Sequence, residues 1–343
     1  MQGVTADARF LSARRHSSRH EAVLLDARGR DVAVLGLPER GHSFAVDAAR
    51  QRAVVFARQP GFHAFAFDLA GARLGELPLA EGRHFFGHGV FSAGGTRLFA
   101  TENDYEAGRA VLGVYDARPG AQWQRLGEFD CGGIGAHEVV LLPDGRTLCV
   151  ANGGLLTHPD FGKEPLNIAT MQSSLVYLDA ADGRMLESVS LAPELFQLSI
   201  RHLAVDATGA VWFACQHQGP ASEQPPLLGV HRRGEAAQLL SAATPVQRAL
   251  RNYLGSIAID QQSGIVATSS PNGGTVAWWD MQHRRCLGAT SRPDGCGIAA
   301  LHDGQFLISD GSGCIVSAGP HSEVQSLLAA SRELAWDNHM RRL

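Results

Sequence analysis

The sequence predicts an all-β protein, a seven-bladed β-propeller whose last blade is closed by strands from both ends of the chain. Three observations lead to this fold. One phrase, an apolar strand followed by a turn and a second strand, occurs six times in the 343 residues. Two further strand-like runs follow each copy, which gives units of four short strands at a period of roughly 40–65 residues, as in propeller blades. Both chain ends carry strand-like runs without partners of their own.

The clearest copy of the repeated phrase spans residues 133–154 and reads GIGAHEVVLLPDGRTLCVANGG. It contains an apolar run at residues 139–142, the turn 143–145 with the letters PDG, and a second run at residues 147–151. Two such runs around a short glycine-containing turn predict a β-hairpin. The other five copies begin at these residues: Arg40, Phe86, Ile200, Leu254 and Gly295.

Taken in order, the chain opens with three strand-like runs between residues 9 and 38 that lack an inner partner. Six complete units then follow, and they occupy these approximate ranges: 41–80, 87–130, 136–191, 201–241, 254–290 and 295–328. The tail 333–343 supplies one more inner strand. Together with 9–38 it predicts a seventh blade, which also removes the exposed sheet edges of an open array. We therefore expect residues 1–343 to form one domain, with six or eight blades as alternatives.

Two segments are too long for hairpin turns, residues 152–173 and residues 216–226. Long loops on a rigid scaffold often carry function. The alternative is that both loops only cap one face of the propeller.

Histidines mark one position of the repeat. Four of the six copies place a histidine at the start of the first strand: His42, His88, His137 and His202. Ser256 and Cys296 hold this place in the other two, and His339 lies near the inner strand of the closing blade. Because inner strands line the central channel, we expect the five imidazoles to converge near one mouth. Neutral imidazole is a common ligand for Zn, Cu and Fe. The pattern predicts a metal site; the alternative is channel residues that only hydrogen-bond water and loop backbone.

Polar residues near these histidines are candidates to orient a ligand or to line a pocket: Arg83, His84, Glu102, Tyr105, Glu138, His158, Arg201 and Asp337. A carboxylate such as Glu102 or Asp337 can hold a ligand imidazole in place through its second nitrogen. Glu102 fits a polar turn equally well. Tyr105 and His158 lie in predicted loops that could cover the mouth of the channel.

Charge and motifs exclude several classes of function. The net charge of −4 argues against nucleic acid or an anionic membrane surface as a partner. No apolar run approaches the roughly 20 residues of a transmembrane helix, and the first residues show no hydrophobic signal core. Walker, HExxH and GxSxG motifs are absent from the sequence. We expect a monomer, and no residue requires that it be an enzyme.

The sequence also resembles a family of bacterial propeller proteins of unassigned function, the DUF1513 family. The resemblance spans essentially the whole chain and rests on these words: GRHFFGHGVF, ATENDY, GIGAHEVVLLPDG, ANGGLLTHPD, LNIATMQSSL, SIRHLAVD and WDNHM. Members are typically exported, often with a twin-arginine signal, and are commonly encoded beside imelysin-type lipoproteins and a di-haem thiol-oxidoreductase-like protein. The resemblance implies a periplasmic protein in iron acquisition, with imelysin-like or di-haem proteins as partners.

The resemblance transfers no catalytic residue, but the family positions that match the five histidines are all present. The histidine ring is also similar in architecture to the propeller hub of nitrous oxide reductase, which holds copper. The resulting hypothesis is a periplasmic propeller that binds iron or copper through an axial histidine cluster and acts in iron acquisition. A redox role in iron transfer is left open. Two alternatives are a metal-free interaction scaffold and an enzyme of the lactonase or quinoprotein type. Lactonase-type hubs usually offer carboxylate and asparagine ligands, so the histidine-rich hub counts against them.

Overall fold

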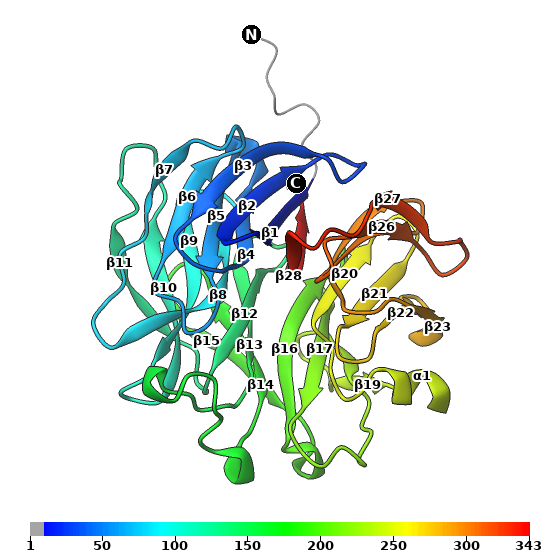
Figure 1. Ribbon diagram of the computed structural model, residues 1–343. Coiled ribbons are helices and arrows are strands. Elements are labelled where there is room, and N and C mark those ends of the chain that lie inside the picture. Colours follow the sequence, from blue (N-terminus) through cyan, green and yellow to red (C-terminus); the bar gives the residue numbers. More distant parts are fainter. Residues whose placement is uncertain (1–9) are drawn as a thin grey trace.

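Seven antiparallel sheets of four strands each surround one central axis (Figure 1). The computed structural model describes residues 10–343, and within them almost every regular element is a strand. The innermost strand of each sheet lies beside the innermost strands of its neighbours, so that together they line a channel. The all-β, seven-bladed propeller predicted from the repeat is confirmed.

Six blades are formed by strands that follow one another along the chain. The first three contain these strands: β4 (Gly41–Asp47), β5 (Arg52–Ala57), β6 (Ala64–Asp68), β7 (Arg73–Glu76), β8 (Arg83–Phe91), β9 (Arg97–Asp104), β10 (Arg109–Asp116), β11 (Arg125–Asp130), β12 (Ala136–Leu141), β13 (Thr147–Asn152), β14 (Ser174–Asp179) and β15 (Met185–Ser190). The next three contain these: β16 (Leu198–Val205), β17 (Val211–His217), β18 (Leu228–His231), β19 (Gln238–Leu240), β20 (Ser256–Asp260), β21 (Ile265–Ser270), β22 (Thr275–Asp280), β23 (Arg285–Ser291), β24 (Gly295–His302), β25 (Gln305–Asp310), β26 (Ile315–Ala318) and β27 (Gln325–Leu328).

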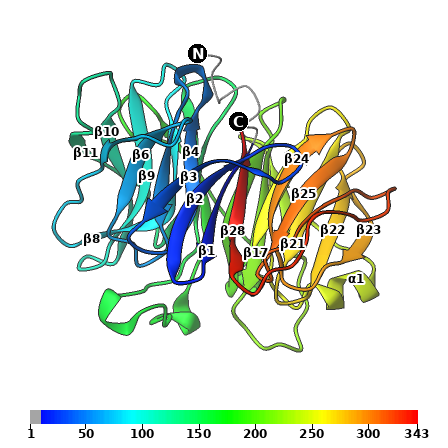
Figure 2. The same cartoon turned by 45° about the horizontal axis from the view of Figure 1, so that its top comes forward.

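The seventh blade joins the two ends of the chain (Figure 2). Its inner strand is β28 (Leu334–Arg342), and its outer strands are β1 (Phe10–His16), β2 (Arg19–Leu25) and β3 (Asp31–Leu37). The order is β28-β1-β2-β3, as predicted for a ring closed by both termini. Closure gives β1 an inner neighbour, so the edge of β1 that faces the channel is paired.

The core lies between neighbouring blades, and strand alternation explains how each blade serves two of them. In the closing blade, Phe10 and Val23 pack against the β24–β27 blade together with Trp336. The intervening residues Leu11 and Leu24 pack against the β4–β7 blade on the other side. Side chains two residues apart share one face of a strand, so an apolar run buried on both faces is what a propeller blade requires.

Some boundaries differ from those expected. β8 begins at Arg83, before residue 87, and β16 begins at Leu198, before residue 201. A short helix, α1 (Thr244–Ala249), connects two blades where no helix was expected. The 152–173 insertion contains the one-turn helices η3 (Pro159–Phe161) and η4 (Ile168–Thr170). Between residues 10 and 343, no helix has the length and apolar character to span a bilayer.

Candidate metal centre

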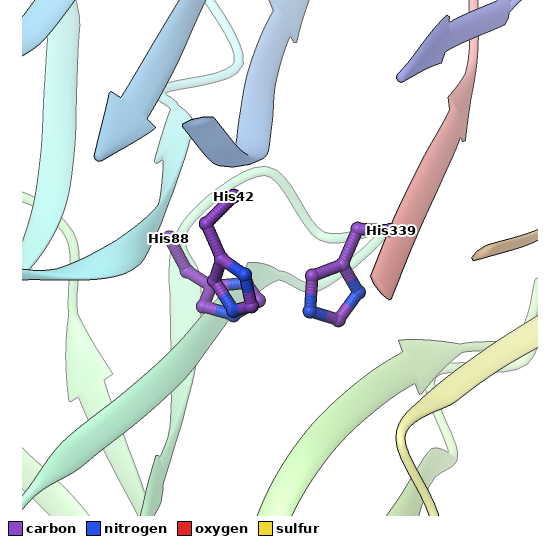
Figure 3. A group of neighbouring side chains, drawn as sticks. All are labelled: His42, His88 and His339. Carbon is purple, nitrogen blue, oxygen red and sulfur yellow. The ribbon is translucent and has the colours of Figure 1, made fainter. Parts of the chain in front are cut away.

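Five imidazoles meet inside the channel, one from each of the inner strands β4, β8, β12, β16 and β28. They are the five histidines at the repeat position and in the closing strand: His42, His88, His137, His202 and His339. All five are buried, with 1–8% of their surface exposed. Ring centroids lie 4.5 Å apart for His42 and His339 and 4.7 Å apart for His137 and His202. Figure 3 shows three of these side chains, which come from separate strands and lie close together.

A β-bulge interrupts strand pairing at or beside each of these histidines. The residues left without a pairing partner include His42 in β4, His137 in β12 and His339 in β28. In β8 the bulge ends at His88, and in β16 it lies immediately before the histidine. The inner strand β20, which carries Ser256 instead, pairs with β21 without a shift in register. Since a bulge redirects side chains, it explains how the imidazoles point into the channel.

Hydroxyl groups of second strands support two of these bulges. Thr101 Oγ1 on β9 donates to the carbonyl of His88 at 3.1 Å. Ser12 Oγ on β1 donates to the carbonyl of His339 at 3.0 Å. Both carbonyls are thus satisfied although the strand ladder is interrupted, which makes the bulges compatible with burial.

Several ring nitrogens have no hydrogen-bond partner within the described residues 10–343. Both nitrogens of His88 are buried without one, as are Nδ1 of His137 and Nε2 of His339. The histidines form two triads whose nitrogens lie within 4.8 Å of one another, His42 with His88 and His339, and His88 with His137 and His202. His88 belongs to both triads. Buried polar atoms are rarely left unpaired, so these nitrogens are available for a ligand.

Two buried carboxylates orient the cluster. Nδ1 of His42 donates to Oδ1 of Asp337 at 2.9 Å. Nδ1 of His202 lies 3.3 Å from Oε2 of Glu138, which also accepts the backbone N–H of residue 203. The other oxygen of Glu138 pairs with Arg341 of β28, across the channel. A carboxylate on Nδ1 leaves Nε2 of the same ring as the metal-binding atom, the arrangement found at many protein metal sites.

The imidazoles of the cluster are neutral, and the two carboxylates beside them are ionised. Burial lowers the pKa of His42 to about 3 and that of His202 to about 4. Burial also lowers the pKa of the other three imidazoles. For Asp337, burial alone would raise the pKa, but His42 and Arg40 hold it below its usual range. Neutral imidazoles beside ionised carboxylates are the protonation states that metal binding needs.

Acid is expected to destabilise the metal-free protein between about pH 6.5 and pH 4. Histidines of the unfolded chain take up protons near pH 6.5, whereas His42 and His202 stay neutral in the folded protein down to about pH 3 and 4. The unfolded state then binds more protons, so the free energy of unfolding falls as the pH falls, by about 1.4 kcal/mol per pH unit for each such histidine. Urea denaturation at pH 7.5, 6.5, 5.5 and 4.5 measures this slope. A flat profile would contradict it.

Two other predicted residues, Arg83 and Glu102, make their polar contacts within their own blade. Arg83 forms ion pairs with Asp104 and Glu128 in its own blade. Glu102 is fully buried on β9, not in a turn, and accepts hydrogen bonds from Tyr115 Oη at 2.6 Å and from an arginine of β11. Strand β8 begins earlier than expected, so Arg83 is its first residue and pairs regularly, before the bulge that ends at His88.

His84, Tyr105 and His158 form an aromatic cluster. Tyr105 stacks on His84 with centroids 6.0 Å apart and meets His158 edge-on at 5.1 Å. Phe86 connects the group to the metal centre, since its ring lies 5.4 Å from His84 and 6.3 Å from His137. None of these three residues is among those that line the cavity above the histidines.

A cavity of about 170 Å³ opens above the cluster, with His42, His137 and His202 among its lining residues. Of the predicted pocket residues, Arg201 lines it. Sequence reasoning missed Arg58 and Lys163, which also line it. Arg58 follows β5 and has no repeat position, and Lys163 lies in the 152–173 insertion. The one feature of the sequence that could have drawn attention to Lys163 is that it is the chain's only lysine.

Several solved structures share the fold at low sequence identity. Hydrazine synthase from Kuenenia stuttgartiensis superposes with a TM-score of 0.66 and 13% identity, over 88% of this chain and 90% of that chain. The β-propeller domain of Cps50 (Swd1) from Myceliophteria thermophila gives 0.60 and 12%, over 88% and 93%. BamB from Moraxella catarrhalis gives 0.55 and 15%, over 88% and 80%. At these identities, the likeness supports the fold alone.

Sequence comparison is more specific. No curated protein sequence matches the chain. The family profile described as "Protein of unknown function (DUF1513)" matches residues 35–343. The match begins within β3 and continues through the closing strand β28. The match includes all five histidines and both carboxylates that orient them. The chain belongs to the DUF1513 family.

Proposed function

We propose that the protein binds a transition-metal ion, iron or copper, through the axial histidine cluster. The observation that carries this proposal is the burial together of five imidazoles from five blades, several with nitrogens that have no partner among residues 10–343. Leaving polar atoms unpaired in the interior costs free energy. A bound cation would satisfy these nitrogens together. Channel residues that only hydrogen-bond water would not need five imidazoles buried at one place.

The geometry is compatible with metal coordination after small side-chain rotations. Bonds of about 2.0–2.1 Å to imidazole keep two ligand nitrogens at most about 4.2 Å apart. The nitrogens of each triad already lie within 4.8 Å of one another. His42 and His202 would bind through Nε2, because their Nδ1 atoms face carboxylates. His88 would be the central ligand, since it belongs to both triads.

The ligand set favours metals that accept nitrogen. Cys296 lies at the repeat position of β24, but burial raises its pKa to about 12, so its thiol stays protonated. Its Sγ lies 3.3 Å from the carbonyl of Asp337, as expected for a donated hydrogen bond. Imidazole without thiolate suits copper, iron, nickel and zinc, and copper(II) binds such sites most tightly of the divalent ions. Family resemblance favours iron or copper and implies action in the periplasm during iron acquisition.

Replacement of His88 by glutamine is expected to weaken metal binding by more than about 100-fold. The loss of an outer partner of a metal ligand alone typically costs 10–100-fold, and His88 is shared by both triads. Elemental analysis of the native protein gives its metal content. Titration of chelator-treated protein with Cu(II), Fe(II) and Zn(II) gives the affinities, and nitrogen hyperfine splitting in the Cu(II) electron paramagnetic resonance spectrum reports imidazole ligands.

His302→Gln is the matched control, because its side chain is 59% exposed and lies outside the cluster. It should bind metal like the wild type. Circular dichroism establishes that both variants are folded. Wild-type protein that binds none of the three metals, or a His88→Gln variant with unchanged affinity, would overturn the proposal and favour a metal-free interaction scaffold.

A further inference from the structure

The cavity above the histidines has a strongly cationic lining. Of the described residues that line it, three carry positive charge, Arg58, Lys163 and Arg201, and none is an aspartate or glutamate. The three come from different parts of the chain, the end of β5, the 152–173 insertion and the bulge of β16. Converging cations without a counter-charge attract anions, most strongly in a recess with low-dielectric walls.

These cations are poorly compensated. Nε of Arg201 is buried and has no hydrogen-bond partner among residues 10–343. The carboxylate paired with Arg58 is that of Asp337, at 4.0 Å, and Asp337 lies closer to Arg40. Lys163 lies at the exposed rim, where partial burial and the charges of the neighbouring arginines lower its pKa to about 8. Arg58 and Arg201 are half-buried and Lys163 is exposed. Partly desolvated charges without close partners favour an anionic ligand.

The insertion that brings Lys163 to this site is fixed in place. Asn167 accepts the backbone N–H of Leu156 at 2.8 Å and donates to the carbonyl of Gly154 at 2.9 Å. Gln59, in the loop after β5, donates to Thr157 Oγ1 at 3.0 Å. These hydrogen bonds hold the loop in place as one wall of the cavity.

Neutral polar groups complete the lining. Tyr253, Gln216, Gln218 and Asn338 all face the cavity. Hydroxyl and carboxamide groups can donate hydrogen bonds to oxygen atoms of a ligand. The volume of about 170 Å³ far exceeds the roughly 10–15 Å³ that one water needs, so the cavity accommodates a ligand of several heavy atoms.

We propose that this cavity binds a small oxyanion with at least two negative charges, a polycarboxylate or a phosphate. Arg58 and Arg201 would hold it by charge-assisted hydrogen bonds, and Lys163 would contribute from the rim. The site does not depend on a metal, because the three cations are present in the chain itself. When a metal occupies the histidines below, the same anion would lie next to it, and the two ligands would then change each other's affinity by the same factor.

Calorimetric titration of the chelator-treated, full-length protein with citrate, inorganic phosphate and acetate tests the proposal. Citrate or phosphate should bind, and acetate, with one charge, should bind at least about tenfold more weakly. Arg201→Gln and Lys163→Gln should each weaken binding of the preferred anion by at least about tenfold. Hydrogen bonds from charged groups are stronger than those from neutral groups by free energies of this order. The preference between citrate and phosphate identifies the carboxylate or the phosphate as the ligand class.

Arg285→Gln is the control, because its side chain is 68% exposed on the outer strand β23 and does not line the cavity. It should bind the anion like the wild type. Arg201→Gln should melt no lower than the wild type, since it removes an uncompensated charge, and Lys163→Gln tests the site without altering the core. His88→Gln should retain anion binding, which separates this proposal from the metal proposal. Absence of citrate and phosphate binding, or equal binding in all variants, would overturn it.

Discussion

Deleting residues 333–343 is expected to unfold the protein, although it removes only a short C-terminal segment. The deletion takes away β28, the inner strand of the closing blade, and exposes the edge of β1. It also removes Trp336 and Met340 from the core shared with the β24–β27 blade. Losing a buried Trp or Met side chain costs about 2–5 kcal/mol each, and the lost strand pairing adds to this. Whole proteins are stable by only about 5–15 kcal/mol.

Near-ultraviolet circular dichroism and urea denaturation measure the result. We expect the shortened chain to lose its tertiary signal and its cooperative transition at 25 °C. A synthetic peptide with the sequence of residues 333–343 is the informative control, because it can add to the open edge of β1 as a strand. Its addition should restore part of the signal, and a peptide with Trp336→Ala should restore less. A cooperative melt of the shortened chain near the wild-type temperature would show that closure contributes little.

The blade count and the closure follow from features that the sequence displays directly. Each inner hairpin has an apolar run, a turn and a second apolar run, and the period of four strands recurs without large gaps except at two insertions. Closure could be predicted because three N-terminal runs had no inner strand and the tail had no outer ones. The strand β28 then pairs with β1, with Ser12 opposite Met340. Symmetry fixes such features, so local patterns are sufficient to predict them.

The convergence of the five histidines was predictable for the same reason, but their local geometry was not. A repeat position indicates only that His42, His88 and His137 lie at equivalent places on inner strands. The bulges that turn these side chains into the channel depend on how each inner strand pairs with its neighbour. A one-residue change in register moves a side chain to the opposite face. Sequence alone gave no indication of where pairing would shift, or that β8 would begin as early as Arg83.

The cationic cavity was beyond sequence reasoning because it is assembled by loops. Arg58 and Lys163 have no equivalent in other repeats, and nothing in their flanking residues indicates a common destination. Their convergence depends on tertiary hydrogen bonds such as those of Asn167 and Gln59 with the insertion. Arg201 was a candidate only because it precedes His202, and its exposure to the cavity results from the bulge in β16.

Replacing His339 with alanine is expected to remove most of the stabilisation that a bound metal gives, while the metal-free protein keeps its stability. The side chain sits against His42, His88 and His202 with ring centroids 4.5–4.8 Å away. Its Nε2 has no partner among the described residues, so alanine breaks no hydrogen bond there. The bond from Ser12 uses the His339 carbonyl and remains. Water can fill the polar space that the ring leaves.

The expected size of the effect follows from mass action. Metal at 1,000 times its dissociation constant stabilises the folded state by about 4.1 kcal/mol, and a ligand loss that weakens binding about 100-fold leaves about 1.4 kcal/mol. For a chain of 343 residues, these values correspond to increases in melting temperature of about 6 °C and about 2 °C. Thermal melts of wild type and His339→Ala, with and without Cu(II) or Fe(II), measure both. Because His339 lies on β28, a reduced shift would link metal binding to closure of the propeller, whereas equal metal content and equal shifts would leave a site of four histidines.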